Sequence, residues 1–117
     1  MSKLYVQHAA PVLSYSGSLA AATAITGSAH CAGYARLVGF ITSDASSASE
    51  SASFFSIKQS VDSGANFDYT SASNLFGAGG GSAACAATVV GNAVKVYYKS
   101  GISTIANLRT GFWLLPI

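Results

Sequence analysis

Residues 55–61, with the sequence FSIKQSV, indicate the fold class because their side chains alternate with a period of two. Apolar side chains at positions 55, 57 and 61 fall on one face, and polar side chains at positions 56, 58 and 60 fall on the other. A β-strand points successive side chains to opposite faces, so this pattern is typical of a half-buried strand.

A second run, residues 94–99 (VKVYYK), repeats this alternation. Positions 94, 96 and 98 are expected to face inward, and Lys95 and Lys99 to face solvent. Turn-forming residues flank the run, Gly91-Asn92 before it and Ser100-Gly101 after it. We expect residues 88–90 to pair with this strand across the Gly91-Asn92 turn.

Further strand candidates follow the same logic. Residues 34–42 predict a more buried strand, because Leu37, Val38, Phe40 and Ile41 fill both faces. Residues 3–12, with Leu4 and Val6 on one face, and residues 66–70 are additional candidates. In residues 108–117, positions 108, 112 and 114 form one apolar face and positions 113 and 115 another. Such a strand either lies centrally between two layers or packs against another subunit.

The remaining segments contain small residues. Residues 18–25 are alanine-rich and leave a short helix open as an alternative, although no apolar stripe of helical spacing is present. Residues 43–53 and 71–87 are low in complexity and are expected to be irregular. Seven or eight short strands in 117 residues predict one all-β domain, residues 1–117. We expect a single antiparallel, jelly-roll-like β-sandwich with Ser/Ala/Gly-rich loops.

The composition restricts the function classes. Six Lys or Arg and four Asp or Glu make up 9% of the chain, against about 25% in a typical domain. The six cations are not clustered along the chain, which argues against a nucleic-acid partner. They are Lys3, Arg36, Lys58, Lys95, Lys99 and Arg109.

No run of residues is long and apolar enough for a transmembrane helix, which needs about 18 or more apolar residues, so no membrane partner is expected. Residues 19–24 are small, as at a signal-peptide cleavage site, but no apolar segment precedes them. We therefore expect an unprocessed protein made in the cytoplasm.

The two cysteines, Cys31 and Cys85, are far apart and form no C-x-x-C pair. We expect both to be reduced and buried, with a Cys31–Cys85 disulfide as the alternative. A zinc site of His30, Cys31 and Cys85 is disfavoured because adjacent residues rarely bind one ion. No metal and no cofactor is expected.

Residues 62–68 (DSGANFD) place oxygen-bearing side chains at Asp62, Asn66 and Asp68. Calcium loops use such spacing, but no EF-hand pattern is present, and a turn with Gly64 at positive φ is the preferred interpretation. Asp62→Ala is then expected to have little effect unless the turn holds an ion.

No catalytic residues are predicted. His8 and His30 have no carboxylate near them in sequence, and neither a G-x-S-x-G motif nor a phosphate-binding loop occurs. The four carboxylates lie in loop-like segments, so a glycosidase pair is not favoured. We expect a protein that is not an enzyme.

Aromatic residues leave a sugar-binding platform open as an alternative to ordinary packing. The candidates are Tyr5, Tyr15, Tyr34, Phe54, Tyr69, Tyr97, Tyr98 and Trp113.

Two segments resemble small all-β structural proteins of bacteriophage particles. In that family an ARL-x-G strand, here residues 35–39, precedes a QS-x-D-x-G-x-N-[FW]-D stretch, here residues 59–68. Residues 91–117 resemble its final hairpin. The resemblance implies a virion component, either a capsid decoration (cement) protein or a tail protein. It carries no catalytic site.

The resemblance and the composition together predict adhesion. A chain with ten charges is expected to have much of its surface covered by neighbours. We expect a homo-oligomer, a trimer in the simplest case, that binds the major capsid protein or another virion protein. A tail adhesin or a carbohydrate-binding module is the alternative function. The expected interface residues are Phe112, Trp113, Leu115, Ile117, Leu75 and Phe76.

Overall fold

The computed structural model describes residues 9–44, 53–73 and 82–116, which form eight β-strands and no helix. No helix in these residues could therefore cross a membrane. The strands are β1 (Ala10–Leu19), β2 (Ala24–His30), β3 (Tyr34–Ser43), β4 (Phe54–Ser60), β5 (Tyr69–Ser73), β6 (Ser82–Thr88), β7 (Ala93–Lys99) and β8 (Ile105–Pro116).

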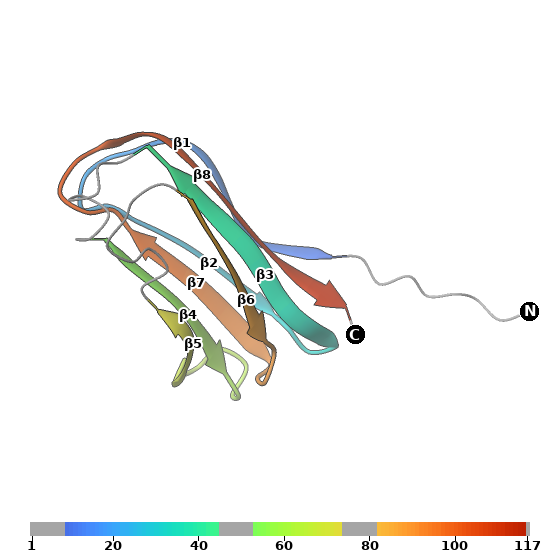
Figure 1. Ribbon diagram of the computed structural model, residues 1–117. Helices are drawn as coiled ribbons and strands as arrows, with labels where there is room; N and C mark the ends of the chain where they lie inside the picture. Colours follow the sequence, from blue (N-terminus) through green and yellow to red (C-terminus); the bar gives the residue numbers. More distant parts are fainter. Residues whose placement is uncertain (1–8, 45–52, 74–81, 117) are drawn as a thin grey trace, which may run out of the picture.

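The strands form two antiparallel sheets that pack face to face (Figure 1). Sheet A has the order β1-β8-β3-β6, and sheet B has the order β2-β7-β4-β5. The first strand pairs with the last, the second with the seventh, the third with the sixth and the fourth with the fifth. The pairings are those of one long antiparallel hairpin, with its bend between β4 and β5, that is folded into two sheets. The jelly-roll-like sandwich predicted from the sequence is confirmed.

The predicted alternation is confirmed in β7 and in part of β4. Val94, Val96 and Tyr98 are fully buried, while Lys99 is exposed. Phe55 and Ile57 are buried as expected. Three residues depart from it: Val61 follows the end of β4 and is 77% exposed, while Ser56 and Ser60, predicted on the polar face, are 4% and 1% exposed.

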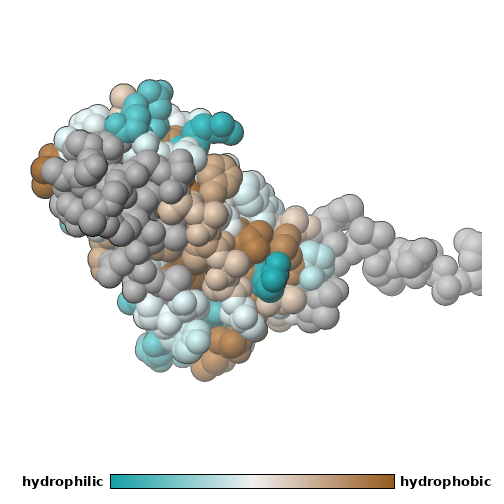
Figure 2. Space-filling view, in the orientation of Figure 1, coloured by the Kyte–Doolittle hydropathy of each residue, from teal (hydrophilic) through white to brown (hydrophobic). Residues whose placement is uncertain are grey.

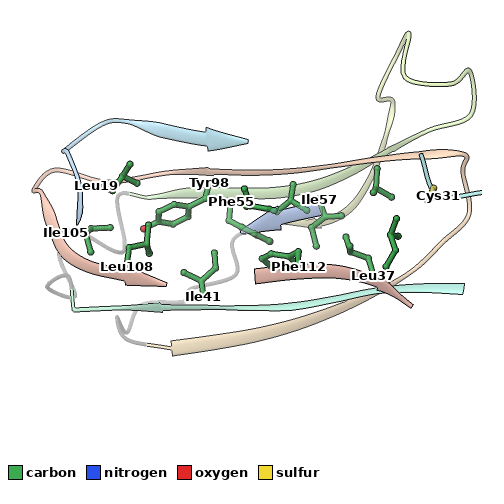
Figure 3. Packing of buried hydrophobic residues seen from close by; sticks show 14 residues of the cluster. Leu19, Cys31, Leu37, Ile41, Phe55, Ile57, Tyr98, Ile105, Leu108 and Phe112 are labelled. Atoms are coloured by element: carbon green, nitrogen blue, oxygen red, sulfur yellow. The ribbon is translucent and has the colours of Figure 1, made fainter. Parts of the chain in front are cut away.

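The core lies between the two sheets (Figure 3). Phe55 of sheet B and Phe112 of sheet A stack across it, with ring centroids 5.7 Å apart. The core extends from Leu19 and Ile105 at one end to Cys31 at the other. Burial of these side chains between the two sheets provides the main stabilisation of the sandwich.

A buried amide ties the two sheets together at the Cys31 end. Gln59 of β4 is 2% exposed, and its side chain makes four hydrogen bonds. Its Nε2 donates to Thr88 O and Ser71 Oγ, each at 2.8 Å. Its Oε1 accepts from the backbone N–H groups of Val90, at 2.8 Å, and Gly91, at 3.0 Å. Residues 88–91 are where the chain leaves sheet A for sheet B, so Gln59 fixes this crossing.

That crossing corrects one expectation. Residues 88–90 do not pair with β7 across the Gly91-Asn92 turn, because β6 ends at Thr88 and pairs with β3, while β7 pairs with β2 and β4. The Gly91-Asn92 turn signal predicted a hairpin, but the chain passes from sheet A to sheet B there. A turn sequence does not indicate whether the strands on either side of it pair with each other or join different sheets.

Other boundaries also differ from the sequence prediction. The alternative of a helix in residues 18–25 is wrong, because β1 ends and β2 begins within this segment. The first described strand starts at Ala10, and residues 3–8 lie outside the described part. The strand expected at 66–70 lies at Tyr69–Ser73. Much of the segment expected to be irregular, 71–87, is β5 and β6, while residues 74–81 are not described.

Replacement of Gln59 by leucine tests the crossing. Gln59→Leu keeps a similar volume but leaves Thr88 O and the N–H groups of Val90 and Gly91 without their partner. We expect the free energy of unfolding to fall by about 2–3 kcal/mol, measured by urea denaturation. Lys58→Leu, one residue earlier and on the outer face, is the matched control and should change stability by less than about 0.5 kcal/mol. Equal effects of the two variants would contradict the assigned role.

Candidate functional site

The outer face of sheet A carries a set of neighbouring apolar side chains that the described residues cover only in part. Strand register builds it: Trp113 lies opposite Pro11 and Val38, and Phe40 lies opposite Gly111 and Ala84. Figure 2 shows tan and brown atoms along the side of the molecule where β3 and β6 are seen. We call these residues the apolar patch: Pro11, Val38, Phe40, Ala84, Ala86, Gly111, Trp113 and Leu115.

Trp113 lies at the centre of the apolar patch and is held flat on it. Its ring stacks on Phe40, with centroids 6.2 Å apart and planes 28° apart. Gly111 makes room for it, since a Cβ there would lie 2.2 Å from the indole ring. The side chain is half-buried against its own sheet. The patch is therefore a shallow surface, with its central ring held in place by packing, and not a cavity.

The predicted interface residues separate into three groups. Trp113 and Leu115 are on the apolar patch and are half-buried. Phe112 is fully buried in the core, so its inclusion among the interface residues is wrong. The reason is the strand period, because Phe112 is adjacent to Trp113 and must point to the opposite face. Ile117, Leu75 and Phe76 lie outside the described residues.

The part of the patch that β3 and β6 supply was not predicted from the sequence. Val38 and Phe40 were expected only to fill the second face of a buried strand, and this second apolar face is the feature that could have indicated the patch. No sequence feature indicated Ala84 and Ala86, because they lie in a segment expected to be irregular. They join the patch through the pairing of β6 with β3.

The charges flanking the apolar patch are both positive. Arg36 lies opposite Leu115 near one end, and Arg109 lies opposite Thr42 near the other. Asp44, just beyond the end of β3, accepts hydrogen bonds from Asn107 N at 3.1 Å and Nδ2 at 2.8 Å. These bonds lower the pKa of Asp44 below its ordinary value. No ion pair joins a carboxylate to either arginine among the described residues.

The cysteines and histidines form no metal site in the described residues. Both cysteines are free, so the alternative of a Cys31–Cys85 disulfide is not supported. Cys31 is buried, as expected, and its thiol donates to Gly91 O at 3.3 Å. Cys85 is only partly buried, in contrast to the expectation. Burial raises the pKa of both thiols. His30 is exposed at the end of β2, and His8 lies outside the described part.

Residues 62–68 form the turn that the sequence favoured. Gly64 has φ +94°, and the Asp62 carboxylate accepts hydrogen bonds from Ser60 Oγ at 2.5 Å, Asn66 N at 2.8 Å and Asn66 Nδ2 at 2.8 Å. These donors hold the pKa of Asp62 at about 2, the Ser60 hydroxyl contributing most. The carboxylate thus organises the turn, so the network argues against the expectation that Asp62→Ala would have little effect.

The aromatic residues do not form one row. Tyr98 is in the core, Tyr15 and Tyr34 pack against it, and Trp113 is on sheet A. Phe54 and Tyr97 meet on the outer face of sheet B, with ring centroids 5.7 Å apart. Tyr69 of β5 is 53% exposed but makes no ring contact among the described residues, and Tyr5 is not described. Of the candidates for a sugar platform, only Phe54 and Tyr97 among the described residues of sheet B meet each other.

The fold resembles several solved structures, while no protein-family model and no curated protein matches the chain. PBSX exported protein XepA has a TM-score of 0.68 and 14% identity, over 94% of this chain and 37% of that one. Aeromonas hydrophila PliG, a periplasmic inhibitor of g-type lysozyme, has a TM-score of 0.53 and 12% identity, over 93% and 92% of the two chains. The CUB1-EGF-CUB2 region of human MASP-1/3 has a TM-score of 0.51 and 9% identity, over 94% and 42%.

These likenesses establish a shared sandwich fold. The chain spans well under half the length of XepA and of the MASP-1/3 region. The names of the three neighbours also differ widely, so the fold by itself assigns no activity.

The Asp62 turn gives a pH-dependent contribution to stability. Because the folded pKa is lowered to about 2 from 3.8, this contribution is present above about pH 4 and is lost as the pH falls through about 2. Asp62→Asn should therefore lose stability at pH 7, and the difference from the parent chain should shrink between pH 4 and pH 2. Thermal unfolding followed by circular dichroism measures both. A constant difference over that range would argue against the carboxylate as the anchor.

Proposed function

We propose that this protein is a structural component of a phage particle that decorates the capsid shell and cements it. Two observations support the phage setting: the resemblance of residues 35–39, 59–68 and 91–117 to small virion proteins, and the fold shared with XepA, which is phage-associated. The role is adhesive and requires no catalysis. The protein would be made in the host cytoplasm and reside in the virion.

The apolar patch is the observation that carries the proposal. A contiguous apolar surface, without a charge at its centre, is typical of a surface that another protein covers. Trp113 supplies the kind of large, half-buried aromatic anchor that dominates binding energy at protein interfaces. The exposed Ala84 and Ala86 are small, so a partner backbone can approach them closely.

The proposed partner of the apolar patch is the shell protein. Arg36 and Arg109 are at opposite ends of the patch, and the patch itself holds no carboxylate. A partner with an apolar centre and acidic groups at its rim would complement this surface. A second copy of the same face would instead bring arginines toward arginines or toward the already hydrogen-bonded Asp44.

The proposed trimer is tested by sedimentation of the isolated protein. Decoration proteins commonly occupy threefold positions of a shell, so we expect a particle of about three times 11.8 kDa. Trp113→Ala should leave this trimer intact if the apolar patch faces the shell. Loss of the trimer in this variant would reassign the patch to contacts between copies, and a monomeric parent chain would refute the trimer.

Cementing is tested on particles with and without the protein. Stripped particles should assemble but release their DNA at a lower temperature than complete ones, because the protein binds the assembled shell and stabilises it by mass action. Adding purified protein should restore the tolerance. Trp113→Ala should bind the shell at least about 30-fold more weakly, corresponding to the loss of about 2 kcal/mol or more.

The matched control for docking is Phe54→Ala, which removes an aromatic side chain from the opposite sheet and should bind shells like the parent chain. Phe112→Ala is unsuitable, because it would open a cavity in the core. Stripped particles that are as robust as complete ones but fail to attach to host cells would refute cementing.

That last outcome would favour the second candidate, a tail adhesin or carbohydrate-binding module. One observation favours it, namely the exposed Phe54 beside Tyr97 on sheet B.

A further inference from the structure

The outer face of sheet B gathers three lysines and two aromatic rings. On β7 the outward positions are Lys95, Tyr97 and Lys99, and on β4 they are Phe54, Ser56 and Lys58. Register places them in pairs: Lys99 opposite Phe54, Tyr97 opposite Ser56, and Lys95 opposite Lys58. We call these six residues the lysine–aromatic groove.

The groove consists of two adjoining hollows that share Phe54 and Tyr97. The larger, of about 600 Å³, is lined also by Lys99, Ser100, Ile102 and their neighbours. The smaller, of about 210 Å³, is lined also by Ser56, Lys58 and Lys95. The aromatic pair thus lies between a hollow with one lysine and a hollow with two. A ligand seated on the rings can reach ammonium groups on both sides.

Among the residues that the structure describes, no carboxylate balances the charge of the groove. Half of the six Lys and Arg residues of the chain lie here, although they are dispersed in the sequence. Lys58 and Lys95 lie directly opposite each other on neighbouring strands, an arrangement of like charges that destabilises a sheet. Within the described ranges no carboxylate is paired with any of the three lysines. Lys95 instead lies over the ring of Phe67, with its Nζ 4.7 Å from the centroid.

The rings offer an apolar platform between these charges. Phe54, the first residue of β4, is 48% exposed although it is a large apolar side chain. Tyr97 packs edge-on against it at 69° and supports its orientation. A binding site built from a few apolar rings and a few well-placed polar groups is the common form of a small-ligand site.

We propose that the lysine–aromatic groove binds an acidic oligosaccharide, with one sugar ring stacked on Phe54 and carboxylates held by the lysines. Successive outward residues of a strand are about 7 Å apart, so Lys95, Tyr97 and Lys99 give a cation, a ring and a cation over about 13 Å. This length matches two or three sugar units. The inference goes beyond the proposed virion role and does not depend on it, because it uses the opposite sheet.

Single-stranded nucleic acid is a less suitable ligand for the lysine–aromatic groove. Its binding proteins stack successive bases on several aromatic side chains along a groove that follows the phosphates. Here the rings of Phe54 and Tyr97 are inclined by 69° to each other, so they do not offer two parallel surfaces for successive bases.

Titration calorimetry with defined probes tests the proposal on the full chain. The acidic probes are a galacturonic acid trimer and sialyllactose, the neutral probe is maltotriose, and the nucleic-acid probe is oligothymidylate. We expect at least one acidic sugar to bind, more weakly as salt is raised, while maltotriose binds at least tenfold more weakly. Failure of both acidic sugars to bind, equal binding of maltotriose, or tighter binding of oligothymidylate would overturn the proposal.

Variants locate the site. Lys58→Gln with Lys95→Gln should weaken binding about 100-fold, and Phe54→Ala about tenfold, since each lost charged or stacking contact corresponds to about tenfold. Trp113→Ala, on the other sheet, is the matched control and should bind the sugar like the parent chain. Thermal unfolding of each variant shows whether it is folded. Folded variants of the groove that bind unchanged would place the sugar elsewhere and refute the assignment.

Measuring the binding of the variants to capsid shells distinguishes a failure of the sugar-binding proposal from a failure of the cementing proposal. Groove variants should still bind capsids, and Trp113→Ala should still bind the sugar. Loss of both activities in one folded variant would contradict the assignment of the two functions to separate sheets.

Discussion

The hydrogen bonds of one buried side chain, Gln59, hold the two sheets together at the β6–β7 connection, one of the places where the chain passes between them. Its amide satisfies three backbone groups of residues 88–91 and the hydroxyl of Ser71. The neighbouring Ser60 accepts from Asn92 N through its backbone carbonyl, at 2.8 Å. Because β6 belongs to sheet A and β7 to sheet B, this short connection is one of those that fix the position of one sheet over the other.

The same constraint gives a structural meaning to residues 59–68. Gln59 fixes the crossing, Ser60 and Asn66 donate to the Asp62 carboxylate, and Gly64 adopts the positive φ of the turn. The pattern that resembles virion proteins is therefore a set of residues that organises one end of the sandwich. A protein with this framework would need these residues whatever its function. The pattern therefore does not decide between cementing and sugar binding.

With the core fixed, the outward positions of the strands become free to differ between the two sheets. On sheet A the patch is apolar, and Gly111 allows Trp113 to lie flat. On sheet B the corresponding positions of β4 and β7 hold lysines beside Phe54 and Tyr97. One face is suited to a large apolar partner and the other to a small anionic one. A protein that docks by one sheet would present the other to solvent.

The sequence by itself determined the strands whose side chains alternate, such as β7, because alternation is a local property of a chain with a period of two. It also determined that Trp113 and Leu115 share a face. It could not separate Phe112 from an interface, since a strand with two apolar faces does not reveal which one meets the core. Only the tertiary structure decided that β6 pairs with β3 and that Lys58 lies opposite Lys95. Those neighbours are far apart in the chain, and their pairing depends on how the whole hairpin rolls up.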